Sequence, residues 1–216
     1  VGKTWDPEHT KSIIENRLKN KSKTFTGAYI ITNQGIKAPK SEVVVDNFLK
    51  PIWENKKALG KTAIEHSSLQ KMHQELSKHR GWGGGGFMSY EVVTDLNYTS
   101  VLEKATDKMA WANAGPGAVR GLNRIHNRKL EKALKQDQCN IEMRDLLLFG
   151  KENSYIKSVV LKNININDID MRTIEHSLCE WDKYERVRLG QGRPRSKYKA
   201  ESSLFATNEF KKGTVK

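Results

Sequence analysis

Residues 111–124 read Trp-Ala-Asn-Ala-Gly-Pro-Gly-Ala-Val-Arg-Gly-Leu-Asn-Arg, and this stretch decides the fold that we expect. Its Gly115-Pro116-Gly117 turn opens a segment with a helical pattern that carries Arg120 and Arg124. Glycine allows a positive φ and a close approach of the backbone to a neighbour, and the free N–H groups of a helix N-terminus bind phosphate oxygens. The layout predicts a helix-hairpin-helix that holds the DNA backbone, with an ordinary helix–helix connection as the alternative.

The charge of the chain favours the DNA-binding alternative. Its 216 residues contain 38 Lys and Arg against 25 Asp and Glu, which gives a net charge of +13. Such an excess attracts a polyanion. We expect double-stranded nucleic acid rather than a membrane as the partner, since the sequence shows no basic amphipathic anchor and no membrane-spanning apolar run. Two cysteines, Cys139 and Cys179, make no disulfide framework, and no signal peptide is visible, so a cytoplasmic location is expected.

Apolar residues recur at helical spacing through most of the chain, which predicts a mainly α-helical protein. Aromatic and β-branched residues favour a strand at 25–38, and residues 153–166 are typical of extended structure. We expect one domain over 1–216 or two lobes, about 1–80 and 81–187, with a basic C-terminal arm at 188–216. Helices are predicted over residues 7–20, 41–55, 62–79, 87–104, 118–137, 141–149 and 170–187, the last one capped by Asp170.

One face of the helix predicted at 170–187 carries candidate catalytic residues. His176, Glu180 and Lys183 fall on the face opposite the apolar stripe. A carboxylate held beside a lysine can accept a proton or hold a substrate ammonium group. The alternative is a solvated face with an ordinary ion pair. The spacing of His176, Cys179 and Glu180 matches no closed zinc site, so we expect no metal and no cofactor.

The chain after this helix is rich in arginine and lysine, including Arg193, Arg195 and Lys197. Guanidinium groups make bidentate contacts to phosphate oxygens, so a helix with a carboxylate that leads into such a run suits a reaction at a phosphorylated centre. Glu91 and Asp95 are one helical turn apart and form a second candidate, because two carboxylates in one pocket titrate as a unit. Tryptophans beside these motifs either belong to the core or stack on an extruded base; they are Trp82, Trp111 and Trp181.

Four segments resemble those of the bacteriophage thymidine-hypermodification proteins, the amino acid:DNA transferases also called α-glutamyl/putrescinyl-thymine pyrophosphorylases. That family is related to DNA glycosylases and to the helical domain of 5-hydroxymethyluracil DNA kinases. The resemblance covers roughly residues 24–198 and implies a helical DNA-glycosylase-like fold with a helix-hairpin-helix, which replaces the strand expected at 25–38. The segments that carry it are Phe25-Thr26-Gly27-Ala28-Tyr29-Ile30, residues 87–96 (Phe-Met-Ser-Tyr-Glu-Val-Val-Thr-Asp-Leu), residues 111–118 (Trp-Ala-Asn-Ala-Gly-Pro-Gly-Ala) and Cys179-Glu180-Trp181-Asp182-Lys183-Tyr184.

The resemblance implies a transferase that displaces pyrophosphate from 5-(pyrophosphoryloxymethyl)uracil in phage DNA with an amino acid or a polyamine. Asp137 is the one acid near the place of a glycosylase's catalytic aspartate, and its polar surroundings argue against cleavage of the N-glycosidic bond. Two alternatives remain: a non-catalytic DNA-binding module that partners a hydroxymethyluracil DNA kinase, and a base-excising glycosylase.

The transferase hypothesis gives each candidate residue a role. Glu180 or Asp95 deprotonates or orients the amine, with Lys183 beside Glu180. The target base is flipped out of the stack. Arginines and lysines of the C-terminal run take the leaving group and the DNA, namely Arg193, Arg195 and Lys197. The DNA backbone is held by Gly115, Gly117, Arg120 and Arg124.

Overall fold

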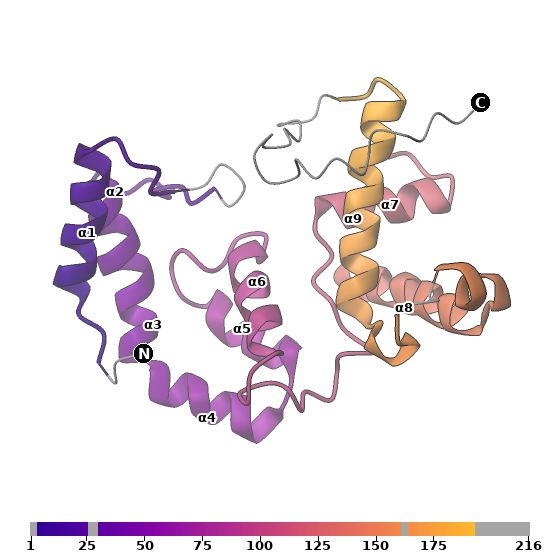
Figure 1. The fold of residues 1–216 in the computed structure, drawn as a ribbon, viewed down its shortest axis with the longest axis horizontal. Helices are drawn as coiled ribbons and strands as arrows, with labels where there is room; N and C mark the ends of the chain where they lie inside the picture. The colour runs from indigo at the N-terminus through magenta and orange to yellow at the C-terminus, as the bar shows by residue number, and fades with distance from the viewer. Residues whose placement is uncertain (1–3, 26–29, 161–163, 193–216) are drawn as a thin grey trace, which may run out of the picture.

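The computed structural model describes residues 4–25, 30–160 and 164–192, and this part of the chain is mainly helical and contains no strand. The mainly α-helical fold is therefore confirmed. Figure 1 shows α1 at the left and α9 toward the right of the molecule. The α-helices are α1 (Pro7–Lys19), α2 (Lys40–Glu42), α3 (Lys50–Glu54), α4 (Lys56–His66), α5 (Leu69–Ser77), α6 (Phe87–Leu96), α7 (Pro116–Ile125), α8 (Gln136–Glu152) and α9 (Met171–Arg188), joined by the π-helices η1 (Val43–Leu49) and η2 (Ile156–Val160) and the 3-10 helix η3 (Ile166–Asp168).

Local sequence signals place several helix ends. Asp6 caps α1 by accepting a hydrogen bond from the His9 N–H at 3.0 Å. Asp170 caps α9 and forms a capping box with Thr173, so the helix expected at 170–187 is confirmed with its cap. These side chains satisfy N–H groups that have no partner within their own helix.

One predicted helix is interrupted by a contact with a distant part of the chain. The helix expected at 62–79 breaks at Ser67, which adopts a left-handed φ of 43°, and Ser68 then caps α5. Asp107 holds this break from outside, because its carboxylate accepts hydrogen bonds from the Ser68 hydroxyl and the Leu69 N–H. Ser68 and Asp107 are 39 residues apart, so the apolar periodicity of residues 62–79 could not predict this break.

The long basic helix expected at 118–137 is wrong. The helix α7 ends at Ile125, Asn127 adopts a left-handed φ of 51°, and α8 begins only at Gln136. The buried Asn123 side chain donates hydrogen bonds to two loop carbonyls, those of Leu130 and Lys132. These bonds give the loop backbone partners that a continuous helix would otherwise supply.

Other differences concern the extended segments and two helix lengths. No strand forms in the described residues of 25–38. The extended structure expected at 153–166 is also wrong in part, because Ile156–Val160 is the π-helix η2. The helix expected at 87–104 ends at Leu96, and the one expected at 141–149 is the longer α8. Tertiary packing outweighs local β propensity, which explains the errors in the two segments expected to be extended.

The main hydrophobic core runs from Leu59 to Leu178 and joins helices α4 to α9. A smaller cluster of Val43, Val44 and Phe48 in η1 packs against apolar residues of the segment that precedes α2, including Ile31 and Ile36. Trp82 and Trp111 are buried and therefore belong to the protein interior.

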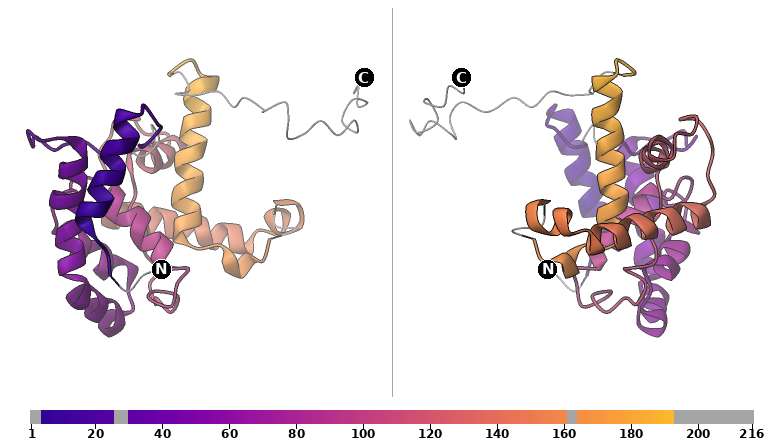
Figure 2. Two further views of the ribbon diagram at one scale, coloured as in Figure 1. Left: turned by 60° about the vertical axis from the view of Figure 1, so that its left-hand side comes forward. Right: turned by 90° about the vertical axis from the view of Figure 1, so that its right-hand side faces the viewer.

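In Figures 1 and 2, α9 crosses α7 and α8, and it packs against both. The helix α9 therefore faces α7 along one side and α8 along another.

Candidate functional site

The glycine turn at the start of α7 differs from the expected phosphate clamp. Gly115 is extended, with φ −76° and ψ 172°, and Gly117 lies inside α7. A Cβ on Gly117 would lie 2.5 Å from the Cys179 Sγ atom on α9. The positive φ expected at these glycines is therefore wrong, and Gly117 instead allows α7 to approach α9 closely. A role of either glycine in DNA binding stays a prediction.

Arg120 and Arg124 of α7 both bind a buried carboxylate of α9. The Nε atom of Arg120 donates to Asp182 Oδ2 at 2.7 Å, and the Nε atom of Arg124 donates to Asp182 Oδ1 at 3.1 Å. The Asp182 side chain is fully buried, whereas that of Arg120 is 30% exposed. Arg124 also donates to the Gln191 side chain at 2.8 Å. The two arginines expected to hold DNA thus tie α7 to α9, and Arg120 is the more accessible.

Glu180 and Lys183 form an exposed ion pair. The Lys183 ammonium group donates to Glu180, whose side chain is 52% exposed, and this hydrogen bond raises the pKa of Lys183. His176 Nε2 lies 3.7 Å from the same carboxylate and is also exposed. This geometry agrees with the alternative given above, a solvent-exposed helix face with an ordinary ion pair. A catalytic role for Glu180 stays a prediction.

Glu91 and Asp95 do not share a pocket, so the expected carboxylate pair is wrong. Glu91 accepts hydrogen bonds from the Arg172 guanidinium at 3.0 and 3.4 Å. Asp95 is exposed, one turn further along α6. Interaction with Arg172 holds Glu91 in place, which leaves no second carboxylate to share a proton with Asp95. The remaining candidates, Arg193, Arg195 and Lys197, lie outside the described residues.

The group that sequence reasoning missed is Glu175, a carboxylate of α9 that is only 8% exposed. It accepts a hydrogen bond from the Gly115 N–H at 3.4 Å, at the N-terminus of α7. Burial raises the pKa of Glu175, and the Gly115 N–H and the Arg172 charge oppose this effect. The sequence did indicate that Glu175 is buried. It lies four residues after Met171 and three before Leu178, which places it on the predicted apolar stripe of α9.

The surroundings of Glu175 combine aromatic rings with one guanidinium. Arg172 lies 5.2 Å from the ring centre of Tyr90, and the buried Tyr90 hydroxyl makes no hydrogen bond within the described residues. Burial is the main cause that raises the pKa of Tyr90. The Tyr90 ring packs edge-on against Trp111 at 5.6 Å, and both rings contact His73, whose pKa is lowered by burial. Helix α6, the segment before α7, and α9 thus meet around Glu175; we call Glu175, Gly115, Tyr90, Glu91 and Arg172 the Glu175 cluster.

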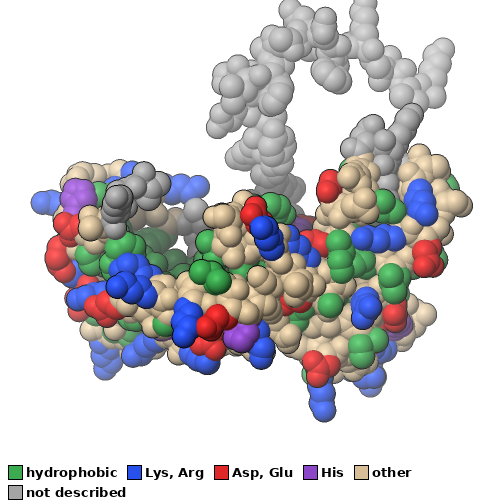
Figure 3. All heavy atoms as spheres, turned by 90° about the horizontal axis from the view of Figure 1, so that it is seen from below, with side chains coloured by type: hydrophobic (Ala, Val, Ile, Leu, Met, Phe, Trp, Pro, Cys, Tyr) green, Lys and Arg blue, Asp and Glu red, His purple; other side chains and the backbone are tan. Residues whose placement is uncertain are grey.

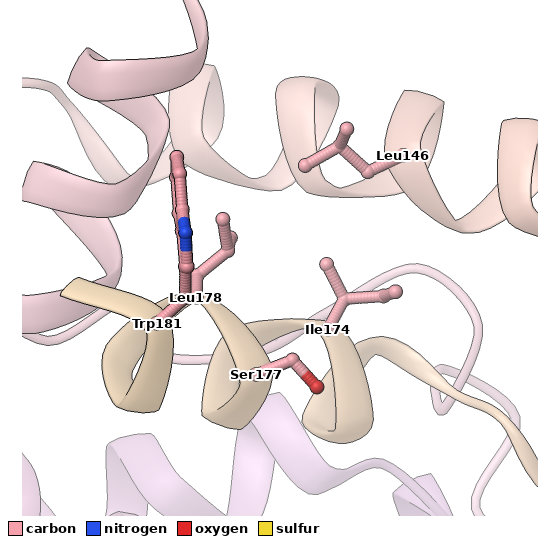
Figure 4. A pocket seen from close by; sticks show the side chains of 5 residues that line it. All are labelled: Leu146, Ile174, Ser177, Leu178 and Trp181. Atoms are coloured by element: carbon pink, nitrogen blue, oxygen red, sulfur yellow. The ribbon is translucent and has the colours of Figure 1, made fainter. Parts of the chain in front are cut away.

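A separate apolar pocket lies between α8 and α9. It has a volume of about 210 Å³ and is lined by Leu146, Ile174, Ser177, Leu178 and Trp181. Figure 4 shows Trp181, Ile174 and Leu146 around this space, and the polar side-chain groups among the five residues are the Ser177 hydroxyl and the Trp181 indole nitrogen. Such a lining provides neither an acid nor a base. The pocket is therefore not a site for the proton transfer or charge stabilisation expected from the sequence.

The family model for the helical domain of 5-hmdU DNA kinase matches residues 1–193. This chain belongs to that family. No significant match was found among curated proteins or among solved structures. Family membership connects this helical domain with the metabolism of modified thymine in DNA and with a DNA kinase, and a helical domain of that kind need not be catalytic itself.

The described part of this helical domain offers neither a membrane-spanning helix nor a metal site. None of its described helices combines the length and apolarity that crossing a bilayer requires. No group of three or more His, Cys, Asp or Glu in the same part of the chain has the arrangement of a metal site.

On the face seen in Figure 3, basic and acidic side chains are interspersed, so the positive charge forms no single large patch there.

Proposed function

We propose that this helical domain transfers an amine to modified thymine in phage DNA. The substrate is 5-(pyrophosphoryloxymethyl)uracil, and the amine comes from an amino acid or a polyamine. A C–N bond forms at the exocyclic methylene carbon, the C–O bond to pyrophosphate breaks with its electron pair, and the attacking nitrogen loses a proton to a base. The reaction needs a base or ammonium anchor near the methylene and cations near the leaving group.

The observation that carries the proposal is the buried carboxylate of Glu175. A carboxylate with a raised pKa, desolvated and held by the Gly115 N–H, has the properties of a general base or of an anchor for a substrate ammonium group. Exposed Glu180 and Asp95 lack that environment, so we propose Glu175 for this role ahead of them. Arg172 supplies positive charge beside it.

The leaving group and the DNA require cations that are open to solvent. Arg193, Arg195 and Lys197 keep the roles proposed from the sequence. Arg120 uses its Nε for Asp182 and is partly exposed, which makes its outer edge suitable for a backbone phosphate.

Nucleoside mass spectrometry tests the proposal. DNA that contains 5-(pyrophosphoryloxymethyl)uracil is incubated with the protein and a panel of amino acids and polyamines, and a nucleoside with the amine in place of pyrophosphate is expected. Glu175→Gln should lower the transfer rate by about 10²–10⁴-fold, while Asp95→Asn, which alters an exposed acid on α6, should stay within a few-fold of the parent. Transfer at the parental rate by Glu175→Gln would remove Glu175 from the mechanism.

A non-catalytic module that partners a hydroxymethyluracil DNA kinase is the second candidate, and it agrees with the family, which is named for a domain of such a kinase. In that case the DNA leaves the incubation with unchanged mass, and the protein raises phosphorylation of hydroxymethyluracil by a separate kinase. A glycosylase would instead leave abasic sites. The same mass-spectrometric assay separates all three.

A further inference from the structure

The loop between α7 and α8, residues 126–135, is strongly basic, and hydrogen bonds hold its backbone. It contains Arg128, Lys129, Lys132 and Lys135 against the single acid Glu131. Four of its residues line an open hollow of about 500 Å³, namely Arg128, Lys129, Glu131 and Lys132. We call residues 126–135 the basic loop.

A buried asparagine and an arginine–glutamate pair hold the basic loop. Asn123, which is fully buried in α7, donates from Nδ2 to the Leu130 carbonyl at 3.1 Å and to the Lys132 carbonyl at 2.9 Å. Arg128 makes a two-pronged contact with Glu142 of α8, and its N–H donates to the Asn123 carbonyl at 2.8 Å. A loop that is ordered before binding loses less conformational entropy when a ligand arrives.

The lysines of the basic loop are available to a ligand. Within the described chain, Arg128 of this loop forms an ion pair with Glu142, and His126 Nε2 lies 3.5 Å from the same carboxylate. Lys129, Lys132 and Lys135 are exposed and have no carboxylate partner there. Lys135 also immediately precedes α8, whose N-terminus carries no side-chain cap and adds its own positive potential. Exposed ammonium groups on a fixed backbone suit a polyanion with regularly spaced charges.

The basic loop leads directly to the Glu175 cluster. Gln136, the residue after Lys135, accepts a hydrogen bond from the Ala114 N–H at 3.0 Å and donates one to the Ala114 carbonyl at 2.9 Å. Ala114 precedes Gly115, whose N–H donates to Glu175. A DNA strand whose phosphates contact the loop lysines would therefore lie close to the N-terminus of α7, where Gly115 donates its hydrogen bond to Glu175.

We infer that the basic loop binds the sugar–phosphate backbone of duplex DNA and that Lys129, Lys132 and Lys135 are its phosphate contacts. The loop thus takes the place that the sequence assigned to the Gly115–Gly117 turn. The inference rests on the proposed function in one respect, that DNA is the ligand, and it does not depend on amine transfer.

The test compares two triple variants of the full chain on a short, unmodified DNA duplex. One variant is K129Q/K132Q/K135Q; the control is K19Q/K21Q/K23Q, which removes the same charge from exposed lysines at the end of α1, on the opposite side of the molecule in Figure 1. Affinity is measured between about 50 and 200 mM salt. Each lost phosphate contact reduces the slope of log K against log salt by about 0.9, so the loop variant should lose a slope of about 3 and the control less than about 1.

Equal changes of slope in the two variants, or an unchanged slope in the loop variant, would overturn the inference. Vesicles with anionic lipid are a second probe. Loss of vesicle binding by the loop variant without any change on DNA would assign the loop to a membrane surface and also refute it. Since the duplex is unmodified and no transfer is measured, a failure here leaves the role of Glu175 standing, and a failure of Glu175→Gln leaves this test unaffected.

Discussion

Replacement of Gly117 by alanine should destabilise the protein by about 1–3 kcal/mol through overpacking between α7 and α9. An added Cβ at this position would lie 2.5 Å from Cys179 Sγ and 3.3 Å from both Cys179 Cα and Cys179 Cβ. Favourable carbon contacts lie near 3.5–4.0 Å. A rotamer change of Cys179 relieves the first contact but not the other two, so α7 must also move away from α9. Urea unfolding followed by helical circular dichroism measures the loss, and the melting temperature should fall by about 2–4 °C for each kcal/mol.

Two other helical glycines are matched controls. A Cβ added to Gly60 in α4 or to Gly150 in α8 would have no neighbour within 4 Å, so alanine there should stabilise by up to about 1 kcal/mol, because glycine is the poorer helix former. Adding Cys179→Ala to Gly117→Ala removes the nearest atom and should restore part of the loss as a coupling free energy. A Gly117→Ala protein as stable as Gly150→Ala would refute the close approach of α7 to α9.

Two further predictions concern the acids of α9. Asp182→Asn should cost about 3–5 kcal/mol in urea unfolding, because Arg120 and Arg124 lose their shared charge partner in a buried site; Asp95→Asn, on the surface, should stay within about 0.5 kcal/mol of the parent, and equal losses would contradict the assignment. Glu175→Gln should be more stable than the parent at neutral pH. Burial raises the pKa of Glu175, so the folded state carries an ionisation penalty above that pKa and loses it as the pH falls. The advantage of Glu175→Gln should therefore shrink in acid, and a pH-independent difference would contradict this.

The parts of the fold that the sequence predicted are those fixed by neighbouring residues. The cap and the extent of α9 follow from Asp170, Thr173 and the apolar spacing after them, all within a few turns. The break after α7 depends on Asn123, whose bonds to two loop carbonyls exist only once the loop has folded back. Polar residues in a helical pattern give no indication whether their side chains face solvent or bind a distant backbone.

The candidate site divides in the same way. Helical spacing correctly placed Glu180 and Lys183 on one exposed face, but spacing alone does not distinguish an ion pair in solvent from a catalytic pair. Arg120 and Arg124 were expected to face DNA, and their partner Asp182 lies 62 and 58 residues further along the chain. The contact between these arginines and Asp182 could be predicted only after α7 and α9 had been placed side by side in the fold.

Glu175 and Asp182 lie seven residues apart on α9, close to two helical turns, so both reach the side of the helix that faces α7. Their environments differ in charge. Asp182 is fully buried between two guanidinium groups, which compensate its charge and make it a structural link. Glu175 has one long hydrogen bond from the Gly115 N–H, and the nearby Arg172 is already bonded to Glu91. A buried charge that is only partly compensated lowers stability, and such groups cluster at functional sites. Of the two buried acids on this helix, Glu175 is therefore the one that we propose for the reaction.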